Sequence, residues 1–194
     1  MDELKEKPPI VQSDGILLMD VHNPEAEEAR SRIAVFSELE KSPEHIHTYR
    51  ITPLSLWNAA SAGYTPQQVI ERLRGCSRYA LPQTVEATIL DQMERFGKLI
   101  LSPRTETTLF LHTQDPAIRA EIQSTKRLER YLSPEGDGFI VNLVDRGTVK
   151  QELIRLGYPV KDEAPLAEGD PLPITLREIT LQGDPFVVRD YQAE

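Results

Sequence analysis

Three short helices followed by a strand pair are the feature of this sequence that most limits its possible folds. Threonine followed by proline stands at 52–53 and again at 65–66, the order in which an N-cap residue precedes the first helical residue. A third stretch of helical periodicity spans 82–97 and ends on glycine. Strand-like runs follow at 98–101 and 107–112. Helix, helix, helix and hairpin is the order of a winged helix, with the third helix in the recognition position and the hairpin as the wing.

Two strands and a helix are predicted before this module. Residues 10–12 and 16–19 flank Ser-Asp-Gly, which is typical of a three-residue hairpin turn. Asn23 and Pro24 predict the start of a helix, and another strand is expected over 45–51. The apolar residues at helical spacing that we expect in the core are Ala26, Ala29, Ile33, Phe36, Leu56, Trp57, Val69, Leu73, Ile89 and Phe96.

A second, smaller α/β unit is predicted after the hairpin. Asp115 and Pro116 indicate a helix start, 139–143 alternates like a strand, and 146–156 has helical periodicity. Prolines among acidic residues predict a linker over 159–173. The expected fold class is therefore α+β, divided into a winged-helix-like domain at 1–101, a small α/β domain at 102–160, and an acidic proline-rich linker within 161–194.

The charge of the chain is negative overall but unevenly distributed. A formal net charge of −9 over 194 residues argues against a nucleic-acid-binding protein when the chain is taken whole. Residues 49–104 nevertheless hold seven basic and four acidic side chains, a net charge of +3. This block is the one that favours a polyanion by itself.

Basic side chains around the three helices and the hairpin are candidate phosphate contacts: Arg72, Arg74, Arg78, Arg95, Lys98 and Arg104. A second candidate face consists of Lys126, Arg127, Arg146 and Lys150. The third helix also carries Glu86, Asp91 and Glu94, which would repel phosphate, so a helix surface that packs on protein is the alternative. DNA binding by these residues is expected to be weak and non-specific.

No catalytic site is predicted in this chain. The Gly-Lys pair at 97–98 is followed by leucine and lacks the pattern of a phosphate-binding loop, so we expect no ATP hydrolysis and no cofactor of its own. His45 and His47 would share one face of a strand, as two metal ligands could. No third ligand stands at a suitable spacing, so we expect histidines at the solvent or the core edge, and no metal.

Cys76 is the single cysteine and has two arginines nearby, which could lower the pKa of a thiol. Without a neighbouring base, a buried small side chain is the expected role rather than a nucleophile. One cysteine also favours a reducing, cytoplasmic setting. The apolar stretches are far shorter than the roughly 20 residues of a membrane span, and the charged N-terminus lacks the features of a signal peptide.

Three segments resemble the amino-terminal region of bacterial XPB-type DNA helicases. The most specific is Glu-His-Ile-His-Thr-Tyr-Arg-Ile-Thr-Pro-Leu-Ser-Leu-Trp-Asn-Ala at 44–59, and the others lie at 9–14 and 77–83. Residues 181–192 resemble the lead-in to the first motor domain of that family. By this resemblance, Gln192 is the candidate for adenine recognition.

The resemblance implies a parent ATP-dependent DNA helicase or translocase linked to nucleotide excision repair, with this chain ending before the motor lobes that use ATP and Mg²⁺. It also implies that about 102–160 form a damage-recognition-like domain. Two roles stay open for the chain. One is an accessory module that engages DNA, and the other is a protein-interaction or autoregulatory module that docks on the motor lobes or on a nuclease.

Overall fold

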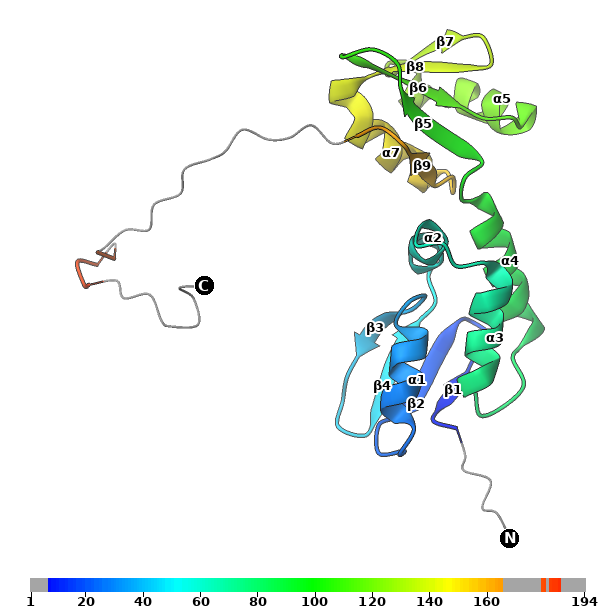
Figure 1. The fold of residues 1–194 in the computed structure, drawn as a ribbon, viewed down its shortest axis with the longest axis vertical. Coiled ribbons are helices and arrows are strands. Elements are labelled where there is room, and N and C mark those ends of the chain that lie inside the picture. Colours follow the sequence, from blue (N-terminus) through cyan, green and yellow to red (C-terminus); the bar gives the residue numbers. More distant parts are fainter. Residues whose placement is uncertain (1–6, 166–178, 181, 186–194) are drawn as a thin grey trace. The chain divides into compact units, whose positions relative to one another are not determined.

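The structure is a computed structural model that describes residues 7–165, 179–180 and 182–185. The chain divides into one unit that ends at Ala164 and a second that begins at Pro165. The first unit contains two sheets, each with its own hydrophobic core (Figure 1). In the second unit an antiparallel bridge joins Ile179 to Pro185. The mixed architecture agrees with the predicted α+β class.

Four antiparallel strands form the first sheet in the order β1-β2-β4-β3. They are β1 (Pro9–Val11), β2 (Ile16–Asp20), β3 (Glu38–Lys41) and β4 (Ile46–Arg50). The hairpin of β1 and β2 is confirmed, and its turn places Gly15 at a φ of 81°, a conformation that glycine adopts readily. No sequence pattern predicts β3, because all four of its residues are exposed and none alternates with a buried one.

The helices of this half are α1 (Ala26–Ile33), α2 (Pro53–Ser61), α3 (Pro66–Cys76) and α4 (Gln83–Arg95). Both predicted threonine caps are confirmed, each within a capping box, Thr52 with Ser55 and Thr65 with Gln68. The predicted start of α1 is wrong by two residues. The Asn23 side chain accepts from the backbone N–H of Glu25 at 2.9 Å, so it closes a turn before the helix instead of capping it.

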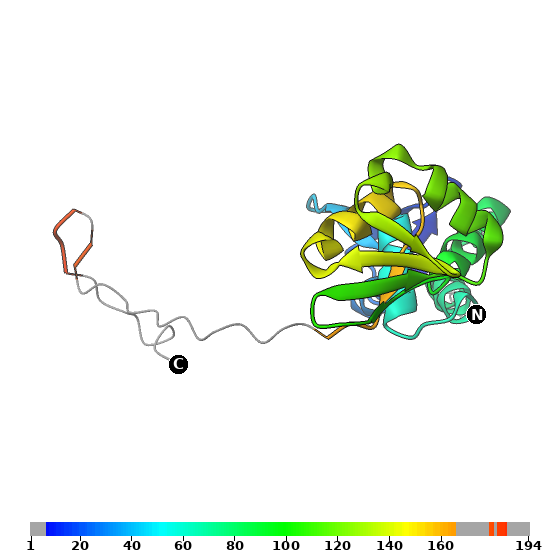
Figure 2. The same cartoon turned by 90° about the horizontal axis from the view of Figure 1, so that it is seen from above.

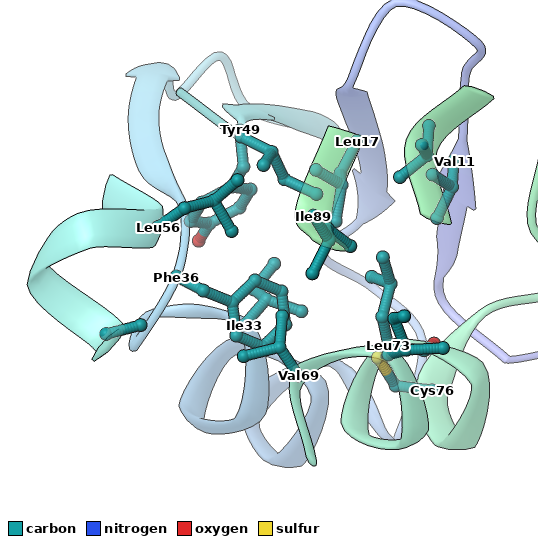
Figure 3. Close-up of a cluster of buried hydrophobic side chains, with 14 of the residues drawn as sticks. Val11, Leu17, Ile33, Phe36, Tyr49, Leu56, Val69, Leu73, Cys76 and Ile89 are labelled. Atoms are coloured by element: carbon teal, nitrogen blue, oxygen red, sulfur yellow. The ribbon is translucent and has the colours of Figure 1, made fainter. Parts of the chain in front are cut away.

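The first core lies between the first sheet and its helices, where apolar side chains from strands and helices converge (Figure 3). Leu17 from β2, Leu73 from α3 and Ile89 from α4 are fully buried in it. Trp57 is 6% exposed, and its Nε1 donates to the carbonyl oxygen of Gln92 on α4 at 3.0 Å. The prediction that Phe96 lies in this core is wrong, because Phe96 follows the last turn of α4 and is only half-buried.

Five strands form the second sheet in the order β7-β8-β6-β5-β9. They are β5 (Leu99–Pro103), β6 (Thr108–His112), β7 (Leu132–Glu135), β8 (Gly138–Asn142) and β9 (Val160–Asp162), with β9 parallel to β5 and the other pairs antiparallel. The helical elements are α5 (Pro116–Ser124), α6 (Lys126–Glu129), the 3₁₀ turn η1 (Leu143–Asp145) and α7 (Arg146–Arg155). Figure 2 shows these strands and helices from above.

The strand pair expected as a wing belongs to this second sheet, so the winged-helix arrangement is not confirmed. β6 pairs with β8, and Leu101 and Leu109 pack in the second core rather than against α2–α4. The expected boundary after residue 101 falls inside β5, and the expected linker contains β9. The pairing of β6 with β8 and that of β5 with β9 have no local sequence signature. The strands of each pair lie far apart in the chain, and β9 is short and polar.

Gly138 stands where no side chain fits. A Cβ atom there would lie 2.4 Å from the carbonyl oxygen of Leu111 and 2.7 Å from Cζ of Phe110. Because a backbone atom cannot move aside by a rotamer change, we expect Gly138→Ala to lower the free energy of unfolding by about 2 kcal/mol, measured by urea denaturation. The matched control is Gly147→Ala in α7, where nothing lies within 4 Å and stability should be unchanged or raised. Equal losses in both variants would contradict this account.

Candidate nucleic-acid interface

Two of the predicted DNA-binding arginines are paired with carboxylates of α4. Nε and Nη2 of Arg74 donate to Oε1 of Glu86 at 2.9 and 2.6 Å, which links α3 to α4. Arg95 pairs with Asp91 one turn earlier in α4, at 3.0 Å. The acidic side chains that were expected to repel phosphate therefore neutralise these arginines, and the helix pair offers less positive charge than its sequence indicates.

Arg72 and Arg78 have different surroundings. The guanidinium carbon of Arg72 lies 4.9 Å from the ring centroid of Tyr64, a cation–π contact, and Arg72 has no ion pair with a carboxylate of the described residues. Nε of Arg78 donates to the backbone carbonyl oxygen of Lys7 at 3.0 Å, and its backbone N–H donates to Pro9. Arg78 thus holds the first strand against the end of α3, which is a structural role.

Lys98 and Arg104 lie near opposite ends of β5. The Lys98 side chain is exposed and has no ion-pair partner among the residues that the structure describes. Arg104 forms an ion pair with Glu135 of β7, and its guanidinium carbon lies 5.5 Å from the ring centroid of Phe110. Of the two, Lys98 is the one whose charge is available to a phosphate.

The second predicted DNA-binding face also contains both accessible cations and cations that are paired with a carboxylate. Lys126 is exposed at the start of α6, without an ion-pair partner in the described part of the chain. Arg127 is 74% exposed and lies 3.8 Å from Glu152 of α7, the long limit of an ion pair. These two side chains can reach an external polyanion.

Arg146 and Lys150 instead converge on Asp162 of β9. Nη2 of Arg146 lies 2.8 Å from Oδ1 of Asp162, Nζ of Lys150 lies 2.7 Å from Oδ2, and Arg146 also donates to the carbonyl oxygen of Ala164 at 2.6 Å. Burial by itself would raise the pKa of Asp162, but hydrogen bonds from Arg146 and then from Lys150 outweigh it and hold the pKa below its ordinary value. The cluster ties α7 to the edge strand of the sheet.

A pocket of about 590 Å³ lies where β5 begins and β6 ends. Ile100 and His112 are direct cross-strand neighbours, half-buried, and both line it. The remaining lining residues are Gly97, Lys98, Thr113, Gln114, Asp115 and Pro116. Nδ1 of His112 is buried and has no hydrogen-bond partner among the described residues. The pocket lining therefore combines apolar surface with one cation, Lys98, and one carboxylate, Asp115.

The other histidines and the cysteine are not arranged for catalysis. Nε2 of His22 lies 2.8 Å from Nδ1 of His45, a hydrogen bond between two exposed rings, whereas His47 is half-buried. No three candidate metal ligands gather anywhere in the described residues. Cys76 is buried as predicted, its Sγ lies 3.4 Å from the carbonyl oxygen of Leu73, and burial raises the pKa of its thiol. A thiol held protonated in a core is a poor nucleophile.

Some features of this region have no signature in the sequence. Asp162 lies in the expected linker, and its role becomes visible only when β9 pairs with β5. The hydrogen bond between His22 and His45 forms because the end of β2 lies beside the start of β4. Gln192, the candidate for adenine recognition, lies outside the described residues. Among the helices that the structure describes, none is long and apolar enough to cross a membrane.

Comparisons with known proteins agree with the resemblance seen in the sequence. Residues 10–135 match a family model described as "Helicase conserved C-terminal domain". The chain is 40% identical over 97% of its length to the DNA 3'-5' helicase XPB of Mycobacterium tuberculosis, and 39% identical over 98% to that of Kineococcus radiotolerans. It is 28% identical over 84% of its length to the general transcription and DNA repair factor IIH helicase/translocase subunit XPB of Enterocytozoon bieneusi.

The matched length limits what these relatives say about the chain. The chain spans about a third of the length of the two bacterial relatives, 34% of each, and 27% of the third. The match to the family model nevertheless covers more than half of the chain, including the whole first core and three strands of the second sheet, β5, β6 and β7. The chain therefore belongs to the helicase family that this model describes, and its relatives include the bacterial XPB helicases.

Proposed function

We propose that this chain is an accessory, DNA-engaging region of an ATP-dependent DNA helicase or translocase linked to nucleotide excision repair, without ATPase activity of its own. The observation that carries the proposal is the similarity to DNA helicases over nearly the whole chain. In the parent protein, ATP and Mg²⁺ would act in the motor lobes, and this region would help them hold DNA. A cytoplasmic location belongs to the same proposal.

The two hydrophobic cores suggest that two different roles belong to two parts of the chain. We assign the accessory role to the first core with α2–α4, and the damage-recognition-like role to the second sheet with its helices. A natural boundary between them is Gly97, which follows α4 at a φ of 85° and precedes β5. We assign DNA contacts mainly to Lys98 and Lys126, two exposed cations without an ion-pair partner in the described part of the chain. Few such contacts predict weak, electrostatic and sequence-independent binding.

Charge reversal of these lysines tests the proposal. We expect Lys98→Glu combined with Lys126→Glu to weaken binding to any duplex on the order of tenfold, and to reduce the slope of log K against log salt by about 1.8, because each lost phosphate contact removes about 0.9. Fluorescence anisotropy with plain and forked duplexes over a salt series measures both quantities.

The matched control is Lys41→Glu, an exposed lysine on β3 outside the proposed interface, which should leave the salt slope unchanged. The assignment of these lysines would be overturned if the DNA affinity did not depend on salt concentration. It would also be overturned if the double variant and the Lys41→Glu control changed the affinity equally. Such a result would favour docking on the motor lobes or on a nuclease.

One observation favours that second candidate. Val144 in η1 is 90% exposed. Leu143, also in η1, is 39% exposed, and Ile154 of α7 is 40% exposed. A contiguous apolar patch that includes such residues would suit a protein contact. If docking is the function, Val144→Glu should abolish capture of the separately expressed motor lobes, while DNA binding stays the same.

A further inference from the structure

We infer that His22 and His45 form a two-histidine site for a divalent transition metal ion, with copper(II) bound more tightly than nickel(II) or zinc(II). This inference does not depend on the proposed DNA-engaging function. Nε2 of His22 lies 2.8 Å from Nδ1 of His45, and both side chains are exposed. Imidazole nitrogen is a ligand that suits copper, nickel and zinc. The sequence alone suggests His47 as the companion of His45, whereas the structure supplies His22.

Backbone hydrogen bonds hold both histidines in place. The end of β2 pairs with the start of β4 through Asp20 and Ile46, so the residues after Asp20 lie beside those before Ile46. The backbone N–H of Val21 donates to the carbonyl oxygen of His45 at 3.1 Å. The backbone N–H of His22 donates to Oδ1 of Asp20 at 3.0 Å. Because the fold of the sheet already brings the two rings together, a metal ion that binds both has less of the chain to order.

The distance between the two ring nitrogen atoms suits a metal ion that holds two ligands at a right angle. Bonds from a metal ion to histidine nitrogen are about 2.0–2.1 Å long. Two such bonds at a right angle place the nitrogen atoms about 2.8–3.0 Å apart, whereas the tetrahedral angle places them about 3.3–3.4 Å apart. The observed 2.8 Å agrees with the square-planar geometry of copper(II) and nickel(II). The ring planes are tilted by 46°, and rotation about the side-chain bonds directs both lone pairs at one ion.

The hydrogen bond between the rings can be exchanged for a metal ion without loss of a proton. A neutral imidazole carries one N–H and one lone pair, so the two facing nitrogen atoms share one hydrogen. The donor ring frees its lone pair when that hydrogen moves to the other nitrogen of the same ring, which is the second neutral tautomer. The bond that is lost is exposed to water, and such a bond contributes little to stability because water replaces it.

The rest of the coordination sphere is open to solvent. No third candidate ligand joins the two histidines among the residues that the structure describes, so water or an external ligand fills the other positions. Asp20 and Glu44 stand shortly before these histidines in the sequence and add negative charge, which attracts a cation. Open positions are typical of metal sites that exchange ligands and not of structural sites, which are closed by four protein ligands. We therefore expect an exchangeable metal ion at this end of the first sheet.

Isothermal titration of the full chain with copper(II), nickel(II), zinc(II) and Mg²⁺ chlorides tests the site. We expect saturable binding of one copper(II) ion per chain, weaker binding of nickel(II) and zinc(II), and none of Mg²⁺, which takes oxygen ligands. His22→Gln and His45→Gln should each weaken copper(II) binding on the order of a hundredfold, because the ring that is left has no second ligand held beside it. The matched control is His112→Gln on β6, which removes an imidazole of the second sheet and should leave the affinity unchanged.

A second measurement uses the unmodified chain alone. The electron paramagnetic resonance spectrum of its copper(II) complex should be that of a square-planar ion, with hyperfine splitting from two imidazole nitrogen atoms. Splitting from fewer than two imidazoles, or no saturable binding of copper(II), would overturn the site. The same holds if a variant that lacks both His22 and His45 keeps the affinity of the unmodified chain. None of these outcomes bears on the DNA-engaging function, because no DNA is present in either measurement.

Discussion

Replacing Trp57 with alanine should lower the free energy of unfolding by about 3–5 kcal/mol, the cost of removing a large aromatic side chain from a packed core. The indole is 6% exposed, and it also loses the hydrogen bond from Nε1 to the carbonyl oxygen of Gln92. That bond joins α2 to α4, so the variant weakens the contact between two helices as well as leaving a cavity. Urea denaturation followed by far-ultraviolet circular dichroism measures the change.

Leu54→Ala is the matched control for this experiment. Leu54 lies in the same helix but is 49% exposed, so its loss should change stability by less than about 1 kcal/mol. Trp57→Phe should fall between the two, because it keeps most of the buried ring and loses the hydrogen bond. Similar losses for Trp57→Ala and Leu54→Ala would mean that the indole does not occupy the core.

The second large effect is expected at Asp162, where alanine should cost about 3 kcal/mol at neutral pH. Removing this carboxylate leaves Arg146, with a side chain 17% exposed, and Lys150 beside it without their shared counter-charge. A largely buried cation that loses its partner is strongly destabilising. The figure is at the low end of the range for buried pairs, because Lys150 is 37% exposed and partly screened by water.

The pH dependence gives this prediction a second readout. Because the pKa of Asp162 is below its ordinary value in the folded chain, its stabilisation is present above that ordinary value and is lost as the pH falls through the folded pKa. The difference in stability between the unmodified chain and Asp162→Ala should therefore shrink in acid. A difference that does not change with pH would contradict the ion-pair account.

The adjacent carboxylate provides the control. Glu163 pairs with Lys161 at 2.8 Å, but the two side chains are 44% and 51% exposed, so Glu163→Ala should cost less than about 1 kcal/mol. Equal losses at 162 and 163 would show that the burial of the Asp162 cluster has no energetic consequence.

The sequence predicts those parts of this fold whose causes are local. Thr52 and Thr65 cap helices because an adjacent side chain and backbone N–H complete each capping box within three residues. The spacing of Val69, Leu73 and Ile89 predicts buried helix faces, and all three are in the first core. Strand partners have no such local signature. β5 and β6 read as an isolated hairpin, although β6 pairs with β8 and β5 with β9.

The candidate interface was harder to predict for the same reason. A list of arginines gives positive charge, but whether that charge reaches a ligand depends on carboxylates brought close by folding. Arg74 meets Glu86 from a neighbouring helix, and Arg146 meets Asp162 from a distant strand. Lys98 and Lys126 are not distinguished from these arginines by anything in the sequence. The pocket beside His112 likewise requires two strand ends to lie together.

The two hydrophobic cores have a consequence for synthesis of the protein. The buried residues of the first core extend from Val11 to Met93, and those of the second begin only at Leu99. The chain is synthesised from its N-terminus at about 5–20 residues per second. All residues of the first core are therefore synthesised before any strand of the second sheet. The first core can therefore fold on the ribosome, while β5 waits for β9, its last partner in the sheet.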